Sequence, residues 1–306
     1  MLTRLHWLTL FLLSLTVAIG TYRSFSLFSS DAHLQQVPIH RLTRLPQSSP
    51  ISTKIRLTTS STLPYFANKN NLLNQKFVKL GWAWTSLVIC YHAISIASSF
   101  FNHPHQEQES NSPEKKPIPS HHVPRILSLH LVATIQWILL TQWCFGSSLI
   151  ERVLMLSGAQ CIPSLKPASP STLVDHPTQL EHTYCQRRWG KPLPGLDQFV
   201  MSTYRPYWAE GIDVSGHTFL LTFSILLIIS SLRPSLTHLW LTKRPDLVPR
   251  NLRLAIYANL GLLAIWWWML LMTSLYFHGP MEKFAGLLLG SLAWLLSESV
   301  VNRCLG

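Results

Sequence analysis

The sequence predicts an all-α, polytopic membrane protein with about six transmembrane helices. Two observations lead to this class. Only 12% of the 306 residues are charged, about half the share of a typical soluble domain. The apolar residues also gather into stretches close to the length of about 20 residues that spans a bilayer. These stretches lie at 5–22, 78–101, 126–147, 216–232, 252–275 and 283–301.

The first stretch has two interpretations. Arg4 ahead of a Leu-rich run, with the small residues Ala18 and Gly20 after it, also describes a signal peptide. A retained helix that begins in the cytosol and a cleaved signal both place residues 23–77 on the lumenal side. The topology of the rest of the chain is therefore the same in either case.

The loop between the fourth and fifth stretches sets the orientation. It carries Arg233, Lys243, Arg244 and Arg250 against the single acid Asp246, and a short basic loop is typical of the cytosolic side. Alternation from this loop gives the remaining sides and the domain organisation. Residues 1–65 are expected to form an N-terminal helix or signal anchor with a lumenal segment, and 66–301 a membrane domain with a cytosolic, disordered linker at 102–125 and a lumenal loop at 148–215.

Cysteine usage and charge exclude two function classes. The five cysteines contain no Cys-x-x-Cys pair, so we expect no metal site and no cofactor. Cys161 and Cys185 share the lumenal loop, where they either form a disulfide or remain two free thiols. The net charge of +12 is scattered through loops, which favours anionic lipid headgroups over nucleic acid as partners.

The first candidate catalytic residue is His217, which lies where the fourth stretch begins. Gly216 permits unusual backbone angles and close approach of a ligand, Ser215 can cap the helix, and Asp213 lies one turn earlier. The free amides of a helix start favour an anion such as phosphate. The alternative is a capped helix with an interfacial histidine.

The second candidate is His278, at the end of the fifth stretch. Gly279 is expected to break that helix and Pro280 to open the next one. Glu282 follows one turn later and can accept a hydrogen bond from Nδ1 of His278, which would fix the imidazole tautomer. The alternative role for Glu282 is to favour the helix N-terminus through the helix dipole.

The two histidines fall on the same lumenal surface, so they can share one phosphoryl group. One imidazole would attack phosphorus while the other protonates the leaving oxygen, without a metal, if cations neutralise the phosphate oxygens. The candidate cations on that side are Arg187, Arg188, Lys191 and Arg205. Each of them can equally be a solvated charge of the loop.

Four blocks of sequence resemble the fat storage-inducing transmembrane (FIT) family, six-helix proteins of the endoplasmic reticulum. They are Asn74 to Thr85 (NQKFVKLGWAWT), Thr141 to Gly146 (TQWCFG), Asp213 to Leu221 (DVSGHTFLL) and Tyr276 to His278 with Glu282 and Lys283. Residues 1–65 and 102–124 carry no such resemblance.

The resemblance implies a multi-pass protein of the endoplasmic reticulum membrane, related to the lipid phosphate phosphatases. His278 would be the nucleophile and His217 the acid. The implied activity is hydrolysis of the diphosphate of fatty acyl-CoA, giving acyl-4′-phosphopantetheine and adenosine 3′,5′-bisphosphate at the lumenal face and supporting lipid droplet formation. The phosphatase pattern is incomplete in this chain. No Lys stands six residues ahead of Arg205-Pro206, and Met272 stands six residues before His278, where the pattern has an Arg.

A second hypothesis is a non-enzymatic protein that binds triacylglycerol or diacylglycerol and partitions it into droplets. It would use an apolar cavity near Trp266, Trp267 and Trp268. A small transporter is disfavoured because no apolar stretch carries a charged residue at its centre.

Overall fold

The computed structural model confirms the all-α membrane class, with six helices long and apolar enough to cross a bilayer among the described residues. The residues described are 4–30, 65–68, 70–101, 122–141, 149–162, 207–209, 213–242 and 248–305. The six long helices are α1 (Arg4–Ser30), α4 (Gly81–Phe101), α6 (His122–Thr141), α9 (Gly216–Thr242), α10 (Arg250–Tyr276) and α11 (Pro280–Leu305). The spanning segment of α4 starts earlier, at Leu73.

Short elements complete the chain. A 3₁₀ turn η1 (Tyr65–Ala67), a π-helical turn η2 (Leu73–Phe77) and a 3₁₀ turn η3 (Val78–Leu80) lead into α4. Between α6 and α9 lie α7 (Leu149–Leu156) and an antiparallel pair of three-residue strands, β1 (Gln160–Ile162) and β2 (Tyr207–Ala209), in which Cys161 pairs with Trp208.

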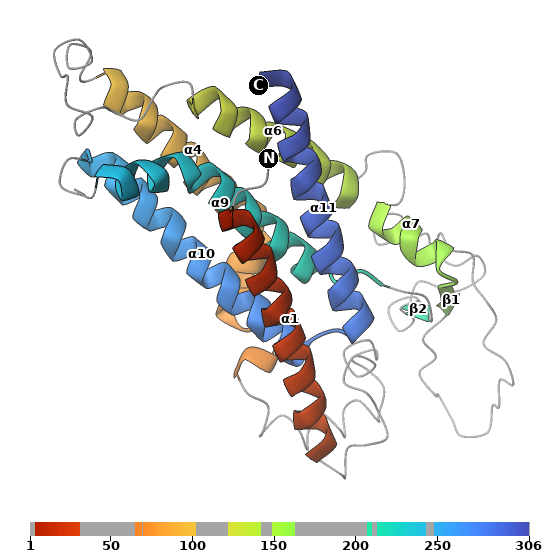
Figure 1. The fold of residues 1–306 in the computed structure, drawn as a ribbon. Coiled ribbons are helices and arrows are strands. Elements are labelled where there is room, and N and C mark those ends of the chain that lie inside the picture. The colour runs from red at the N-terminus through yellow and green to blue at the C-terminus, as the bar shows by residue number, and fades with distance from the viewer. Residues whose placement is uncertain are drawn as a thin grey trace, which may run out of the picture.

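Helix α9 is the centre of the bundle. It packs against α1, α4, α6, α10 and α11, and Figure 1 shows the other long helices arranged around it. Its spanning window is the most buried of the six. A helix that is apolar on all sides suits this position, because every face meets another helix.

Two expected boundaries shift. The third spanning helix begins at His122 rather than at 126, because Pro124 falls in its first turn, where a missing N–H costs no hydrogen bond. The last four residues of the expected 102–125 linker are therefore helical. The expected lumenal loop at 148–215 likewise contains α7 and both strands.

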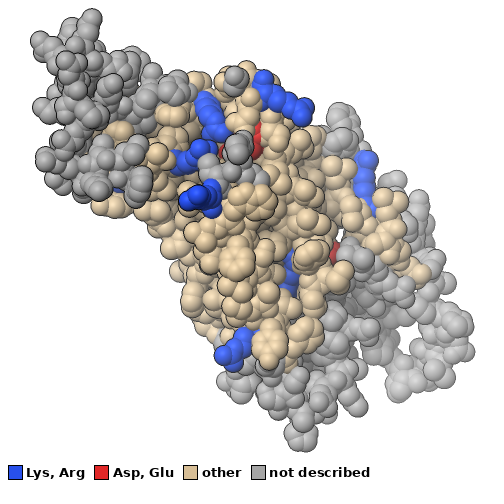
Figure 2. All heavy atoms as spheres, viewed as in Figure 1, with Lys and Arg blue, Asp and Glu red and all other residues tan. Residues whose placement is uncertain are grey.

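The outer surface of the bundle is apolar. On α11 the exposed side chains Phe284, Leu288, Leu292 and Leu296 recur every four residues, so they form one stripe along the helix. Figure 2 shows a broad uncharged surface over the helices, with Lys and Arg gathered mainly at the end where both termini lie in Figure 1. Such a surface is suited to lipid rather than water.

Helix α1 is part of this bundle. Gly20 lies so close to α10 that an added Cβ would stand 2.5 Å from Cβ of Ser274. The indole N–H of Trp267 donates to Thr16 Oγ1 at 3.0 Å, joining the same two helices. Helix α1 therefore packs directly on α10, while the domain division at residue 65 stays a prediction.

Candidate active site

His217 is positioned by a capped helix start. Ser215 precedes the first residue of α9, and its Oγ accepts the backbone N–H of Thr218 at 3.3 Å and the Thr218 hydroxyl at 2.9 Å. This is the geometry of an N-cap. Gly216 does not have a positive φ, so the unusual backbone angles that a glycine permits are not found here. No atom lies within 4 Å of the place where a Cβ would stand, so a ligand can approach the backbone closely at this residue.

His278 is the middle residue of a three-residue turn, Phe277 to Gly279, between α10 and α11. Phe277 leaves α10 with extended backbone angles, and His278 then takes a φ of +62°, the single positive φ of a non-glycine among the described residues. The sequence indicated Gly279 as the helix breaker, but the left-handed residue is the histidine itself. A non-glycine residue held in this region costs of order 1–3 kcal/mol, and such residues concentrate at functional sites.

Glu282 holds this turn in place. Its Oε2 accepts Nδ1–H of His278 at 2.9 Å and the backbone N–H of Gly279 at 3.3 Å. The second contact is the backward bond that a Glu makes at the third position of a helix. One carboxylate therefore both caps α11 and orients the imidazole, so the two roles weighed from the sequence coexist.

The two histidines meet because α11 and α9 touch at their first turns. The backbone N–H of Ser215 donates to the carbonyl of Glu282 at 3.0 Å. Gly286 allows this approach, since an added Cβ would stand 2.7 Å from the carbonyl oxygen of Ser215. The imidazole centroids of His217 and His278 are 6.4 Å apart. We call this end of the bundle the histidine end.

Two residues ahead of α4 join the site although sequence reasoning did not single them out. Oδ1 of Asn74 lies 3.0 Å from Nε2 of His217, so the imidazole carries a proton on Nε2 in this contact. Lys79 lies near enough for its charge to act on His217, and its Nζ donates to Gln75 at 2.6 Å. The signal available was the block NQKFVK, which places polar residues just before an apolar helix.

Lys283 is a second cation at this end; in the sequence it is marked only as part of a block that resembles the FIT family, not as a site residue. Its side chain is buried, and Nζ donates to the carbonyl oxygen of Ser274 at 2.6 Å. This bond ties the first turn of α11 to the last turn of α10. The turn that carries His278 is thus held by two side chains of α11, since Glu282 bonds to the turn itself and Lys283 bonds to the helix before it.

The structure says less about the other predicted site residues. Asp213 is half-buried just ahead of the cap. The four predicted phosphate contacts, Arg187, Arg188, Lys191 and Arg205, lie outside the described residues. Cys161 is disulfide-bonded, while Cys185 lies outside the described residues, so their pairing stays a prediction.

The tryptophans of the lipid-binding hypothesis serve as contacts between elements. Trp266 is fully buried and donates to Thr85 Oγ1 of α4 at 3.2 Å, and Trp267 donates to α1. Trp268 is exposed and packs edge-on against Phe66. Successive residues on a helix point about 100° apart, so the three side chains do not converge on a common cavity.

The fold and the site together define a six-helix membrane protein with a paired-histidine polar site at one end of its bundle. The chain belongs to the family of fat storage-inducing transmembrane proteins, whose family model matches residues 62–248 and 238–297.

Curated relatives are named as diphosphatases. Acyl-coenzyme A diphosphatase fit1 of Schizosaccharomyces pombe is 33% identical over 234 residues, covering 76% of this chain and 72% of the relative. Acyl-coenzyme A diphosphatase FITM2 of Homo sapiens is 31% identical over 237 residues and that of Mus musculus 30% over 236, each with the same coverage. No solved structure matches the chain.

Proposed function

We propose that this chain is a fatty acyl-CoA diphosphatase that acts at the lumenal face of the endoplasmic reticulum membrane. The observation that carries the proposal is the pair of imidazoles 6.4 Å apart, with Glu282 on Nδ1 of one of them. Related proteins named acyl-coenzyme A diphosphatases support the substrate class. The cellular role that follows is support of lipid droplet formation.

The hydrogen bonds support His278 as the nucleophile. Because Glu282 accepts the Nδ1 proton of His278, the lone pair of Nε2 is available for attack. The carboxylate also stabilises the positive charge that the imidazole gains when the N–P bond forms. Reacting atoms stand about 3–3.5 Å apart before reaction, so the separation of the two rings suits one phosphoryl group between them.

His217 then acts as the acid. As Nε2 of His278 bonds to one phosphorus of the diphosphate, the P–O anhydride bond breaks and the leaving oxygen takes a proton from His217. Water next attacks the phosphohistidine and gives a proton back to His217, which returns His278 and releases the second product. Across both steps one water is consumed and acyl-4′-phosphopantetheine and adenosine 3′,5′-bisphosphate are formed.

Asn74 and Lys79 support this chemistry. In the imidazolium form of His217, Nε2–H donates to the Asn74 oxygen, so the proton on Nδ1 is the one that is transferred to the leaving oxygen. Lys79 supplies positive charge beside that histidine, where the phosphate oxygens develop negative charge. Lys79 thereby joins the four predicted cations as a residue that neutralises the diphosphate.

Hydrolysis of oleoyl-CoA by the purified full-length protein in EDTA tests the proposal. We expect His278→Ala to abolish turnover and His217→Ala to lower kcat by about 10²–10⁴-fold, the range for a positioned general acid. His238→Ala is the matched control, because His238 lies on the same helix 21 residues from His217, about 30 Å away. Full activity of both site variants, with thermal stability equal to that of the control, would contradict the proposal.

A further inference from the structure

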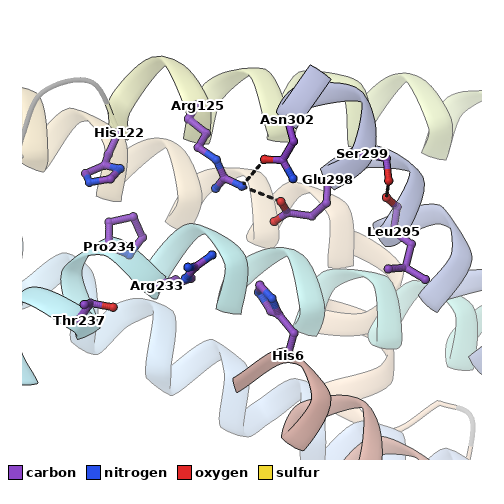
Figure 3. A pocket seen from close by; sticks show the side chains of 10 residues that line it. All are labelled: His6, His122, Arg125, Arg233, Pro234, Thr237, Leu295, Glu298, Ser299 and Asn302. Atoms are coloured by element: carbon purple, nitrogen blue, oxygen red, sulfur yellow. Dashed lines mark hydrogen bonds and ion pairs between the residues drawn. The ribbon is translucent and has the colours of Figure 1, made fainter. Parts of the chain in front are cut away.

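A cavity of about 760 Å³ with charged side chains in its wall lies among α1, α6, α9 and α11. Figure 3 shows its side chains reaching into one space from these four helices. The size falls within the range of small-molecule sites, about 300–1,000 Å³. The lining includes the charged side chains of Arg125, Arg233 and Glu298, and convergent polar groups in a pocket of this size are the default sign of a binding site.

The cavity lies at the opposite end of the bundle from the histidines. Arg233 is 17 residues beyond the start of α9 and Glu298 is 18 beyond the start of α11, about 25–27 Å along each helix. Arg125 belongs to the first turn of α6 and His6 to the first turn of α1. The cavity is thus level with the other membrane surface, about 30 Å from the first.

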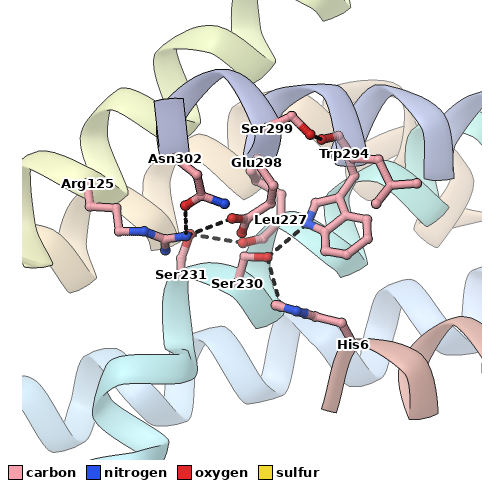
Figure 4. Close-up of polar contacts among 10 residues, drawn as sticks. His6, Arg125, Leu227, Ser230, Ser231, Trp294, Glu298, Ser299 and Asn302 are labelled. Carbon is pink, nitrogen blue, oxygen red and sulfur yellow. Dashed lines mark hydrogen bonds and ion pairs between the residues drawn. The ribbon is translucent and has the colours of Figure 1, made fainter. Parts of the chain in front are cut away.

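One wall is held in a fixed arrangement. The guanidinium of Arg125 donates to Glu298 Oε2 at 2.7 Å and to Asn302 Oδ1 at 3.0 Å. His6 Nε2 lies 3.2 Å from the hydroxyl of Ser230, which also accepts the indole N–H of Trp294 at 2.8 Å. Figure 4 shows these contacts linking α1, α6, α9 and α11 around the cavity.

Two charged groups in the cavity retain unused bonding capacity. Arg233 has no hydrogen bond or ion pair to any other described residue. Oε1 of Glu298 is buried and unpartnered within the described part of the chain. An unpaired buried carboxylate oxygen costs several kcal/mol unless a donor reaches it. The cavity therefore offers a guanidinium to an anion and a carboxylate oxygen to a hydrogen-bond donor.

We propose that this cavity binds the headgroup of a phospholipid that carries both a phosphate and an ammonium group, of the phosphoethanolamine type. Arg233 and Arg125 would contact the phosphate, because guanidinium groups match phosphate geometry. Glu298 Oε1 would accept from the ammonium. The acyl chains would pass from the cavity between the helices to their apolar outer faces. These apolar faces favour a lipid over a soluble phosphate as the ligand. This site is independent of the proposed hydrolase activity.

Thermal unfolding of the full-length protein in detergent micelles, followed by tryptophan fluorescence, tests the site. The additives are dioleoyl phosphatidylethanolamine, dioleoyl phosphatidylcholine and inorganic phosphate at matched concentrations. We expect phosphatidylethanolamine to raise Tm by about 2–5 °C, since a ligand that binds the folded state stabilises it. Phosphatidylcholine, whose quaternary ammonium has no N–H, should give a smaller shift.

The variants are Arg233→Gln, Glu298→Gln and the matched control Arg303→Gln. Arg303 is exposed on α11 at the same end of the bundle but does not line the cavity. We expect Arg233→Gln to lose the shift, Glu298→Gln to lose the preference for ethanolamine over choline, and Arg303→Gln to keep both.

Three results would overturn the proposal. An unchanged shift in Arg233→Gln, or an equal loss in Arg303→Gln, would exclude this cavity as the site. An equal shift with inorganic phosphate would identify a soluble anion rather than a lipid. Equal shifts with the two phospholipids in the unaltered protein would remove the role of Glu298. If Arg233→Gln does not fold, Glu298→Gln alone still decides the headgroup selectivity.

Discussion

At the scale of single residues, Glu282 accepts two hydrogen bonds whose consequences can be separated. Its Oε2 accepts a bond from His278 and another from the backbone of Gly279. The first bears on the chemistry proposed for the imidazole, while the second stabilises the start of α11. A substitution that keeps an acceptor but removes the negative charge distinguishes them.

We predict that Glu282→Gln lowers kcat for oleoyl-CoA by about 10²-fold or more while KM stays within about threefold. Gln at this helix position still caps the helix, so thermal stability should change little, whereas the imidazolium loses its counter-charge. Steady-state kinetics and a melting curve on the same preparation check this. Full kcat in Glu282→Gln would show that the carboxylate serves only as a cap.

At the scale of helices, glycines set how closely α11 approaches α9. Gly286 and Gly290 are one turn apart on α11, and an added Cβ at Gly290 would stand 2.8 Å from the carbonyl oxygen of Phe219. Small residues at this spacing let membrane helices pack backbone to backbone. Because this contact also places Ser215 against Glu282, it aligns the two histidines.

Gly290→Ala should destabilise the protein, because backbone rather than a flexible side chain occupies the space. We expect a loss of about 1–3 kcal/mol in the free energy of unfolding, the usual cost of overpacking. Gly261→Ala on α10 is the control: it has nothing within 4 Å of an added Cβ and should be neutral or stabilising by up to about 1 kcal/mol. Denaturant titration of the purified variants compares the two. Equal effects would mean that α9 and α11 can separate at little cost.

At the scale of the whole molecule, the two polar sites lie at opposite ends of one bundle. The described residues hold six helices long and apolar enough to span a membrane, an even number, and the two ends of the chain lie near each other in Figure 1. The histidine end and the cavity end would therefore face different compartments. The orientation proposed here places the cavity in the cytosol.

Cysteine labelling in sealed vesicles of endoplasmic reticulum checks this orientation. Cys304 is free and exposed near the end of α11, and Met281 is exposed at its start; these residues are 23 positions apart, about 35 Å along the helix. A membrane-impermeant maleimide should label Cys304 at once. It should label Met281→Cys, in a Cys304→Ser background, only after permeabilisation. The reverse pattern would invert the topology.

The amino-acid sequence predicts six spanning segments, which agrees with the six membrane-length helices of the described residues, and it marks the two candidate histidines at helix ends. Length and apolarity decide whether a segment can cross a bilayer, and both histidines stand beside helix-start signals that are local in the chain, namely Ser215 and Pro280. Local signals also marked Glu282, four residues from His278, because that spacing is one helical turn.

The neighbours of each site follow from helix packing and not from local sequence. Asn74 is 143 residues from His217 and Arg125 is 173 from Glu298, and no local pattern links residues at such separations. The left-handed backbone at His278 is likewise imposed by packing, since Gly279 next to it is the residue that backbone preference alone selects. The physical reason is common to these cases: helix formation depends on neighbours in the chain, whereas polar contacts between helices depend on which faces the bundle brings together.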